Sequence, residues 1–424
     1  MRALRFVLRG IGVTLFLLLQ ALLWLAGWLG LLVTFRGKAA RQSWFARRLR
    51  TTMAGMGATY VKVGQIMSTR PDLFPPHIIT ELETLQDDVG AFAFRHVVRT
   101  FREEFGKTPA EVFRDFDETP IASASVAQVH RAVLDDGRRV AVKVRRPALE
   151  EIVAFDLHVM RLFARTIALI PRFRMLAPVD SVSEFANAIR MQIDLTLEAD
   201  HNRRFRGNFA NSPDVEFPEL IEDYCSRRVL TMGFVDGRKV LDYDPAQSDP
   251  KRLARIGFHT LLKMVFDDGF VHADLHPGNI LVTPEDKVCL LDLGLVAELD
   301  EEHRRAFGQY FAGWASGNGV VMAKLMSELS PHSKVRDWDA YEAEVVAFVD
   351  RYYGKQLGEV QISTVALDMM NILRRHRVRV NPIYTMCNIA IAVTEGIGKQ
   401  LAPDLDLMSE TVPFFVRLEQ EGRL

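Results

Sequence analysis

The sequence is poor in cysteine and carries almost no net charge. Its 424 residues include only three cysteines, Cys225, Cys289 and Cys387, which show no metal-binding spacing. Such an odd, sparse count excludes a disulfide framework and suits a reducing compartment. The formal net charge is −1, so no overall basic field favours nucleic acid as a partner. The chain has no internal repeat, and its 48% apolar residues can fill the core of two or three domains.

The most informative stretch begins at His272 and reads His-Ala-Asp-Leu-His-Pro-Gly-Asn. A predicted β-hairpin follows it and ends in Leu291-Asp292-Leu293-Gly294. An Asp, a nearby Asn and an Asp-x-Gly after a short hairpin are typical of the phosphoryl-transfer half of a protein-kinase-like site. We expect Asp274 to orient or deprotonate the acceptor, and Asn279 and Asp292 to hold Mg²⁺ against the phosphates of ATP. A polar loop beside a buried strand is the simpler alternative.

The upstream half of such a site requires a β-hairpin that carries a lysine. Residues 129–134 and 140–144 are predicted strands on either side of the turn Asp135-Asp136-Gly137-Arg138. Lys143 closes the run Val-Ala-Val-Lys, as in the kinase strand whose lysine contacts the α and β phosphates. Many strand lysines are merely solvated, so the order of Lys143, Asp274 and Asp292 along the chain carries this prediction.

A helix over about residues 183–208 is predicted to carry a glutamate that pairs with Lys143. Its apolar stripe consists of residues four apart, Phe185, Ile189, Ile193 and Leu197. Asp194 and Glu198 lie on a different face of the same helix. We expect Glu198 to be the partner of Lys143, with Asp194 facing the same cleft. The alternative is a pair of surface carboxylates.

A further strand is predicted at residues 228–231, between the two lobes of a kinase-like fold. It runs directly into Met232, Gly233 and Phe234. We expect backbone groups of these three residues to contact the adenine edge, as in the hinge of a kinase.

Two features of ordinary protein kinases are missing. Where a glycine-rich loop would cover the phosphates, residues 120–125 read Pro-Ile-Ala-Ser-Ala-Ser. Alanine and serine adopt a positive φ only at a cost, so this loop should cover the phosphates less closely or differently. After Gly294, only residues 295–299 precede a helix predicted near Asp300, and no Ala-Pro-Glu follows. The platform on which protein kinases lay a peptide substrate is therefore absent.

The amino terminus is apolar over a long stretch. Residues 10–35 are 26 positions without a charge, and as a helix they would extend roughly 39 Å, more than a hydrocarbon core of about 30 Å. We predict a membrane anchor at residues 1–36, with one transmembrane helix in the cytoplasmic (inner) membrane. Basic residues are denser after the stretch, which places the kinase-like part in the cytoplasm. A signal peptide and a helix lying in the membrane plane are the alternatives.

Several motifs resemble those of one known family, the UbiB (AarF) family of atypical kinase-like proteins. They are Lys-x-Gly-Gln at residues 62–65, Arg-Pro-Asp-Leu at 70–73, Glu-Thr-Leu-Gln-Asp at 83–87, Gln-Val-His at 128–130 and the loop that starts at His272. The resemblance covers about residues 53–401. It implies an α+β, bilobal protein-kinase-like fold whose helical extension folds over the cleft. The expected divisions are an anchor at 1–36, an extension at 37–115, a small lobe at 116–235 and a large lobe at 236–424.

The resemblance also implies roles for residues outside the kinase motifs. Lys62 and Gln65 would reach the phosphate region from the extension. An alanine-rich nucleotide loop would be formed by Ala122, Ser123, Ala124 and Ser125. A family Glu-x-Asp that positions the extension lysine reads Gln192-Ile193-Asp194 here, so one acid is missing and the hold on Lys62 should be weaker.

Members of this family bind ATP with Mg²⁺ and act mainly as ATPases that support biosynthesis of isoprenoid quinones such as ubiquinone. The resemblance therefore implies a membrane-anchored ATPase whose partners are ATP, membrane lipid or polyprenyl quinone intermediates, and quinone-biosynthetic enzymes. Two alternatives remain open, a small-molecule or lipid phosphotransferase and a nucleotide-gated scaffold for quinone-biosynthetic enzymes. Many relatives are anchored through carboxy-terminal helices, but the uncharged residues 381–394 are too few to span a bilayer and should pack on the large lobe.

Overall fold

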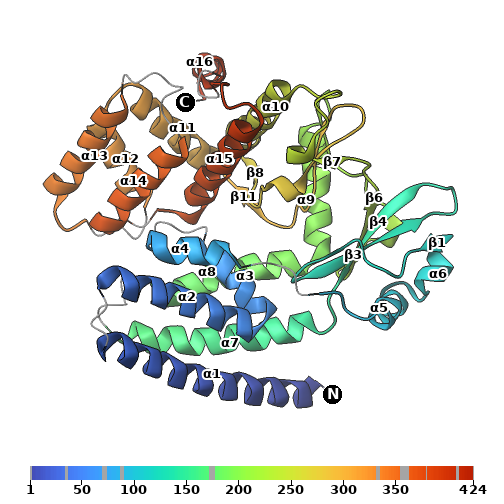
Figure 1. The fold of residues 1–424 in the computed structure, drawn as a ribbon. Helices are drawn as coiled ribbons and strands as arrows, with labels where there is room; N and C mark the ends of the chain where they lie inside the picture. The colour runs from blue at the N-terminus through green and yellow to red at the C-terminus, as the bar shows by residue number, and fades with distance from the viewer. Residues whose placement is uncertain are drawn as a thin grey trace. The chain divides into compact units, whose positions relative to one another are not determined.

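The structure is a computed structural model that describes residues 2–33, 37–68, 74–85, 90–170, 177–330, 335–353, 362–378, 380–406 and 410–423. The chain divides into two compact units. Unit 1 comprises Met1–Leu197 and Leu220–Phe234, and unit 2 comprises Glu198–Glu219 and Val235–Leu424. Helices dominate both units, and each also contains β-sheet, which is an α+β architecture (Figure 1).

Unit 1 combines a helical extension with one sheet. Its helices are α1 (Arg2–Val33), α2 (Lys38–Met56), α3 (Ala58–Ser68), α4 (Pro76–Glu83), α5 (Arg95–Phe105), α6 (Pro109–Val112), α7 (Leu149–Ala168), α8 (Pro178–Ile193), the start of α9 (Leu195–Asn208) and the 3₁₀ turn η2 (Glu222–Tyr224). Its strands are β1 (Asp115–Phe116), β2 (Ala122–Ser123), β3 (Ala127–Val133), β4 (Arg139–Arg145) and β6 (Val229–Gly233).

The sheet of unit 1 has five strands in the order β1-β3-β4-β6, with β2 also paired to β3. Strands β3 and β4 form the predicted hairpin, which is confirmed. At its turn the amide of Leu134 donates to the carbonyl of Arg138 at 2.9 Å, and Gly137 has a φ of 89°, a conformation that suits glycine. Side chains alternate along β4, so the fully buried Val142 faces the core whereas Lys143 faces the other side of the sheet.

One face of this sheet is covered by α5 and α6. The buried side chains shared between them form a core of aliphatic and aromatic residues, which includes Val97, Phe101, Phe113, Val140, Val142, Val144 and Val229. Burying such side chains stabilises the unit by about 1.5–3 kcal/mol for each large one. The opposite face, which carries Lys143, is therefore the face that can be used for chemistry.

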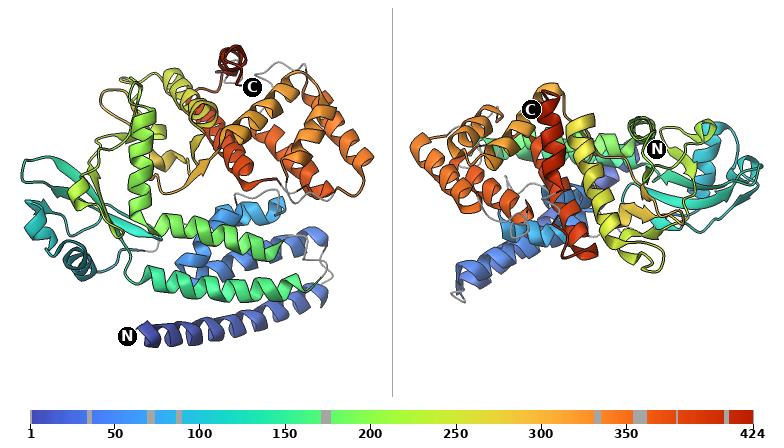
Figure 2. Two further views of the ribbon diagram at one scale, coloured as in Figure 1. Left: turned by 180° about the vertical axis from the view of Figure 1, so that it is seen from behind. Right: turned by 90° about the horizontal axis from the view of Figure 1, so that it is seen from above.

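The helical extension packs into a second core within unit 1. Helices α1, α2, α7 and α8 lie side by side (Figures 1 and 2), and buried residues of α2, α3, α4, α7 and α8 form one cluster. Leu82 of α4 and Ala46 of α2 are fully buried in it. The extension is therefore a packed helical layer that shares a core with α7 and α8.

The predicted transmembrane helix is wrong. Among the residues that the structure describes, no helix combines the length and the apolarity needed to cross a bilayer, which overturns the single N-terminal span and the membrane location built on it. Polar groups inside the uncharged stretch contact α2 instead: Arg48 donates to Gln20 at 2.6 Å, and the indole of Trp24 donates to the Thr52 hydroxyl at 3.2 Å. Trp24 also packs edge-on against Trp44. A count of charges could not foresee these contacts.

Unit 2 begins within α9 and contains two small sheets. Its strands are β5 (Val215–Glu216), β7 (Arg238–Lys239), β8 (Phe270–His272), β9 (Ile280–Val282), β10 (Val288–Leu290) and β11 (Val296–Glu298). Its helices are α10 (Pro250–Leu262), α11 (Glu301–Ala315), α12 (Gly319–Glu328), α13 (Trp338–Tyr352), α14 (Ile362–His376), α15 (Pro382–Leu401) and α16 (Thr411–Gln420). Short helical turns are η3 (Val240–Asp242), η4 (Lys263–Asp268) and η5 (Pro277–Asn279).

The sheets of unit 2 position the predicted catalytic loop. One has the order β5-β10-β9-β7, and the other pairs β8 with β11. Residues 382–394 fall in α15, which Asn381 caps; this helix packs against α10 and buries Tyr384, Cys387 and Ala390. The prediction that this stretch packs on the large lobe is confirmed.

Candidate active site

His272 holds the predicted catalytic loop of unit 2 together. It ends β8 and is fully buried. Its Nδ1 accepts a hydrogen bond from the amide of Asp274 at 3.2 Å, so its Nε2 carries the proton and donates to the carbonyl of Leu291 at 3.0 Å. Burial lowers the pKa of His272, which keeps the ring neutral and preserves this pair of bonds. One side chain thus joins Asp274 to the strand end that precedes Asp292.

The β9–β10 hairpin brings Asn279 close to the same strand end. Ile280 lies opposite Leu290, and the amide of Leu291 donates to the carbonyl of Asn279 at 2.8 Å. The Asn279 side chain donates through Nδ2 to the carbonyl of Asp274 at 3.1 Å, which leaves Oδ1 as its metal-binding atom. Asn279 and Asp292 therefore lie at the open end of one hairpin. The sequence predicted this hairpin between the two residues.

Asp292 has an unusual backbone conformation. Its φ is 51°, in the left-handed region that few residues other than glycine adopt, although Asp and Asn are enriched there. The next residue, Leu293, is buried, and its carbonyl bonds to Nδ1 of His201 at 2.8 Å. The surrounding contacts hold the strained residue in place, an arrangement that is common at functional sites.

The donors at this hairpin end suit a hard cation. Asn279 offers an amide oxygen and Asp292 a carboxylate, both of which are ligands that Mg²⁺ prefers. The part of the chain that the structure describes has no group of three or more His, Cys, Asp or Glu that could hold a metal by itself. Because Mg²⁺ keeps several waters and binds substrate phosphates, two protein ligands are enough to fit it.

Lys143 lies on the face of the unit 1 sheet that is opposite the core formed with α5 and α6. It lies opposite Val129 on β3 and Leu230 on β6, and its side chain is half-buried. Two positions earlier, Ala141 lies opposite Met232, so Lys143 and Met232 belong to the same face. The register therefore brings the predicted phosphate lysine and one end of the predicted hinge to one surface.

The hinge differs from the prediction in one respect. Met232 and Gly233 are still part of β6, and the amide of Phe234 donates to the carbonyl of Arg139 at 3.0 Å. This amide is used by the sheet, so it is not available to adenine in the observed conformation. The ring of Phe234 lies against the guanidinium groups of Arg131 and Arg139.

The alanine-rich loop is held by an arginine that the sequence analysis missed. Ala122 and Ser123 form β2, and the amide of Ala124 donates to the carbonyl of Ala127 at 2.8 Å. Arg146 donates to the carbonyl of Ala124 at 2.7 Å, to the Ser123 hydroxyl at 3.0 Å and to the carbonyl of Gly90 at 2.5 Å. Arg146 stands three residues after Lys143, but no local motif marks an arginine whose partners are 22 or more positions away.

Ser125 completes this loop and differs from Ser123. Its side chain is buried, and its hydroxyl has no hydrogen-bond partner among the residues described. An unpaired buried hydroxyl costs free energy, so it is a candidate for a ligand that the loop would cover.

The predicted helix over residues 183–208 is broken. Helix α8 ends at Ile193 and α9 starts at Leu195, with Asp194 in an extended conformation between them. The Asp194 carboxylate accepts from the amide and hydroxyl of Thr196 at 3.2 and 2.6 Å, and from Arg227 at 3.0 Å. Burial raises the pKa of Asp194, but these hydrogen bonds outweigh it and lower the pKa below its ordinary value. Asp194 therefore caps α9 and does not share a helical face with Glu198.

Glu198 lies in the first turn of α9 and is 3% exposed. A carboxylate this deeply buried requires compensating partners. It belongs to unit 2 together with Asp274, Asn279 and Asp292, whereas Lys143 belongs to unit 1. The pairing of Lys143 with Glu198 and with the catalytic loop consequently stays a prediction.

The Lys-x-Gly-Gln motif lies on α3. Lys62 is half-buried there, and Gly64 is packed so closely that a Cβ would lie 2.3 Å from a methyl carbon of Leu85. The amide of Gln65 donates to the carbonyl of Leu85 at 3.3 Å, and its Oε1 is buried without a partner among the described residues. Gln65 thus contacts the extension itself, and its reach to the phosphates stays a prediction.

Gln128 and His130, which belong to a family motif, form a buried network. His130 bonds through Nδ1 to the carbonyl of Asp117 and through Nε2 to Gln128, both at 2.8 Å, and Gln128 accepts from the amide of Phe92 at 2.9 Å. Burial lowers the pKa of His130, so the ring is neutral. These two residues are structural. Two further motif stretches, 70–73 and 86–87, lie outside the described residues.

Two protein-family domains match this chain. Residues 84–326 match the ABC1 atypical kinase-like domain, and residues 345–406 match the UbiB helical domain. A protein of Aeromonas hydrophila named "Probable protein kinase UbiB" is 34% identical over 401 residues, which cover 89% of this chain and 73% of that protein. A protein of the same name from Vibrio atlanticus is 34% identical over 379 residues, covering 87% of this chain and 69% of that protein.

A solved structure shares the fold. It is the complex structure of Rv3197-erythromycin from Mycobacterium tuberculosis, which aligns with a TM-score of 0.55 and 22% sequence identity. The alignment covers 83% of this chain and 92% of that one. The predicted kinase-like fold is therefore confirmed. From the matched domains and the identity to its relatives, the chain belongs to the UbiB family of ABC1 atypical kinase-like proteins.

Proposed function

We propose that this chain is a Mg²⁺-dependent ATPase that supports the biosynthesis of an isoprenoid quinone of the ubiquinone type, or related lipid metabolism. The observation that carries the proposal is the end of the β9–β10 hairpin. There Asn279 bonds to the backbone of Asp274, and Asp292 follows the paired strand in a left-handed conformation. This is the donor set that phosphoryl transfer from a metal-bound nucleotide needs. The quinone part of the proposal comes from the family resemblance.

In this proposal each site residue has one role. Lys143 binds the α and β phosphates and is oriented by Glu198, whose burial favours a charged partner. Asp274 orients the attacking water or acceptor. Asn279 and Asp292 hold Mg²⁺, which neutralises charge on the phosphates.

Further groups would complete nucleotide binding. Residues Ala122, Ser123, Ala124 and Ser125 cover the phosphates. Lys62 approaches them from the extension, and Gln65 holds the helix that carries it. Backbone groups of Met232 and Gly233 contact adenine, and Asp194 acts by fixing the start of α9.

Water or a small molecule is a better acceptor for this site than a protein. Between Gly294 and the start of α11 at Glu301, the chain forms β11, which pairs with β8. This short connection leaves no segment on which a peptide could lie. The retained Asp274 keeps a small-molecule or lipid phosphotransferase as the second candidate, because a pure scaffold needs metal ligands but no acceptor-orienting residue.

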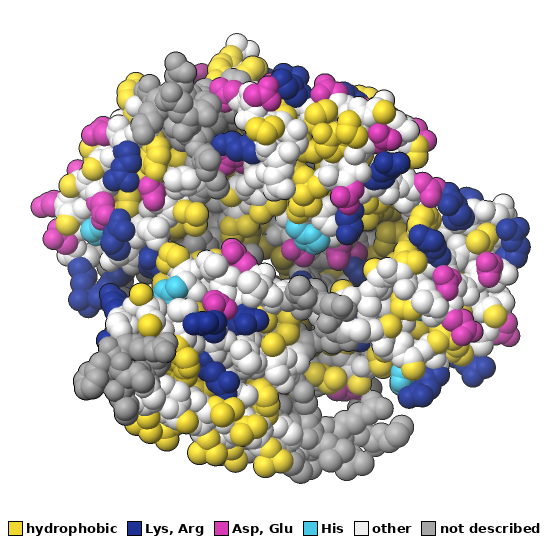
Figure 3. Space-filling model, in the orientation of Figure 1, with side chains coloured by type: hydrophobic (Ala, Val, Ile, Leu, Met, Phe, Trp, Pro, Cys, Tyr) yellow, Lys and Arg dark blue, Asp and Glu magenta, His cyan; other side chains and the backbone are white. Residues whose placement is uncertain are grey.

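A lipid partner is supported by the surface of unit 1. Helix α1 exposes Leu15, Leu18, Leu22, Leu25 and Leu29 by 52–66%, and Figure 3 shows hydrophobic side chains gathered along it. The neighbouring α2 carries lysine and arginine and no acid. An exposed apolar strip beside basic residues suits a polyprenyl lipid or the surface of an anionic bilayer, as a surface contact and not as a span.

The proposal is tested with Asp292→Asn. Asn tolerates the left-handed backbone of residue 292 but removes the metal-binding charge. We expect ATP hydrolysis by the variant to fall by roughly 100-fold or more. The Asp292 carboxylate would hold the metal ion that stabilises the negative charge of the phosphates during transfer. Release of phosphate with Mg-ATP is the measurement.

The matched control is Asp350→Asn, the same change at an exposed position of α13 in the same unit. It should leave turnover unchanged. Unchanged turnover in Asp292→Asn, or no Mg-ATP binding by the wild type, would refute the enzymatic proposal. A phosphorylated metabolite in place of free phosphate would favour the phosphotransferase.

A further inference from the structure

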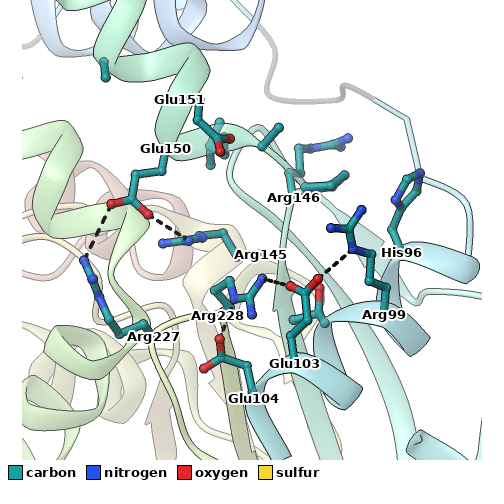
Figure 4. Close-up of a pocket in the computed structure, with 15 residues that line it drawn as sticks. His96, Arg99, Glu103, Glu104, Arg145, Arg146, Glu150, Glu151, Arg227 and Arg228 are labelled. Atoms are coloured by element: carbon teal, nitrogen blue, oxygen red, sulfur yellow. Dashed lines mark hydrogen bonds and ion pairs between the residues drawn. The ribbon is translucent and has the colours of Figure 1, made fainter. Parts of the chain in front are cut away.

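Unit 1 contains a cavity of about 810 Å³ that no part of the proposed nucleotide site uses. It lies between α5, the connection from β4 to α7, and residues 227–228 (Figure 4). We call it the arginine pocket. Its charged lining consists of Arg99, Arg145, Arg146, Arg227 and Arg228 with Glu103, Glu104, Glu150 and Glu151.

Most charges in the arginine pocket are firmly paired. Arg228 donates to Glu103 at 2.6 Å and to Glu104 at 2.5 Å, and Arg99 donates to Glu103 at 2.7 Å. Glu150 is the exception. It lies 3.3 Å from Arg145 and 3.9 Å from Arg227, and its side chain is 54% exposed. Its two ion pairs are therefore the weakest in the pocket.

Arg145 is a buried cation with an open edge. Its side chain is only 7% exposed, and its Nη1 donates to the carbonyl of Ile193 at 2.7 Å. Its Nη2 has the long contact to Glu150, and its Nε has no hydrogen-bond partner among the described residues. Nε and Nη2 form one side of the guanidinium plane, the side that binds two oxygens of a phosphate or carboxylate at once.

The uncapped start of α7, with Glu150 and Glu151 in its first turn, lines the same cavity. Residues 148–151 line it, and the helix that begins there has 20 residues and no side-chain cap. Ala148 precedes it with a φ of 55°. The amides of an uncapped first turn and the helix dipole favour an anion at this end.

We propose that the arginine pocket binds a phosphate-bearing small molecule, whose phosphate replaces Glu150 between Arg145 and Arg227. The anion would satisfy the open edge of Arg145, and the displaced Glu150 would turn to solvent, which its exposure permits. Arg145 follows Lys143 by two positions on β4 and shares its face of the sheet, but none of the residues proposed to bind the nucleotide lines the pocket. The closely paired Glu103 and Glu104 keep Arg99 and Arg228 in place.

The test is a calorimetric titration of the full chain with inorganic pyrophosphate, in EDTA to remove divalent metal. Wild type should bind. Arg227→Gln should bind about 10-fold more weakly, because one charge-assisted contact is lost. Glu150→Gln should bind more tightly by a similar factor, since it removes the internal competitor. All of these side chains are at least half exposed, so the variants should fold.

Two controls separate this pocket from the nucleotide site. Arg138→Gln makes the same charge change on the exposed β3–β4 turn, and Asp292→Asn alters the proposed metal site; both should bind pyrophosphate like the wild type. A loss of pyrophosphate binding in Asp292→Asn, equal affinities in Glu150→Gln and wild type, or no binding by the wild type would each overturn the proposal.

Discussion

At the scale of single residues, the candidate site depends on a neutral histidine and a strained aspartate. His272 can bridge Asp274 and Leu291 only while its Nδ1 is unprotonated, because that atom accepts a hydrogen bond. Asp292 holds its left-handed conformation next to the buried Leu293. The local geometry of the loop therefore depends on the protonation of a side chain that would not itself touch the nucleotide.

Unfolding should depend on pH because of this histidine. Burial lowers the pKa of His272 below its usual 6.5, so around pH 6 the unfolded chain binds a proton that the folded chain does not. Its contribution to stability is complete above pH 6.5 and is lost as the pH falls toward the folded pKa. We expect the free energy of unfolding in urea to fall by up to about 1.4 kcal/mol per pH unit for this group.

The variant His272→Asn tests the origin of this slope. It should be less stable at pH 7.5 but should show a shallower loss between about pH 6.5 and pH 5.5, because one titrating group is gone. Burial also lowers the pKa of His130, so His130 should still contribute to the pH slope in the variant. An identical slope in the variant and the wild type would contradict the assignment.

At the scale of helices and strands, contacts between elements decide what local patterns leave open. The β3–β4 and β9–β10 hairpins were predicted correctly, since strand alternation and turn residues are encoded within a few positions. The end of α8 at Ile193 was not foreseen. Asp194 fits a helical pattern in the sequence. The helix breaks at this residue because its carboxylate binds Arg227, 33 positions further along the chain.

The packing of α12 against α13 leads to a prediction of its own. A Cβ on Gly319 would lie 2.6 Å from the Cα of Val346, a backbone atom that cannot turn aside. Gly319→Ala should therefore lower the free energy of unfolding by about 1–3 kcal/mol. Gly257→Ala is the matched control, a helical glycine of the same unit with no atom within 4 Å of the new Cβ. It should be neutral or slightly stabilising, and equal effects of the two changes would contradict this packing argument.

The contrast between local patterns and contacts of distant elements also explains which site residues the sequence could predict. The Asp274, Asn279 and Asp292 pattern was predictable because one hairpin brings its ends together. The contact of Gln65 with Leu85 was not, since it depends on how α3 packs on the chain after α4. The transmembrane prediction failed for a related reason, because hydropathy records the absence of charge but not the presence of a partner such as Arg48.

At the scale of the whole molecule, α1 offers a surface that the kinase-like motifs do not explain. The exposed leucines of α1 cover one side of unit 1, while Gln20 and Trp24 bind α2. Burying such leucines in lipid would be favourable by about 1.5–3 kcal/mol each. We expect this surface to contact lipid.

Introducing charge on this surface should weaken lipid binding. Leu18 and Leu22 are 59% and 66% exposed, so Leu18→Glu with Leu22→Glu should not disturb the core. We expect co-sedimentation with vesicles of phosphatidylcholine and phosphatidylglycerol to fall by roughly 100-fold in affinity, from two lost apolar side chains. Leu367→Glu, at a 51% exposed position of α14, should bind like the wild type. Equal binding by both variants would exclude α1 as the lipid contact.

The three hydrogen bonds of Arg146 have a consequence for how relatives should be compared. A planar fork with several N–H groups can span acceptors on two separate segments, whereas a lysine ammonium is a single point of contact. Exchange of Arg146 for lysine would therefore release the loop at Ser123 and Ala124 while leaving its own residues unaltered. Two proteins with the same alanine-rich loop can consequently differ in its mobility, and the residue that decides this directly follows β4.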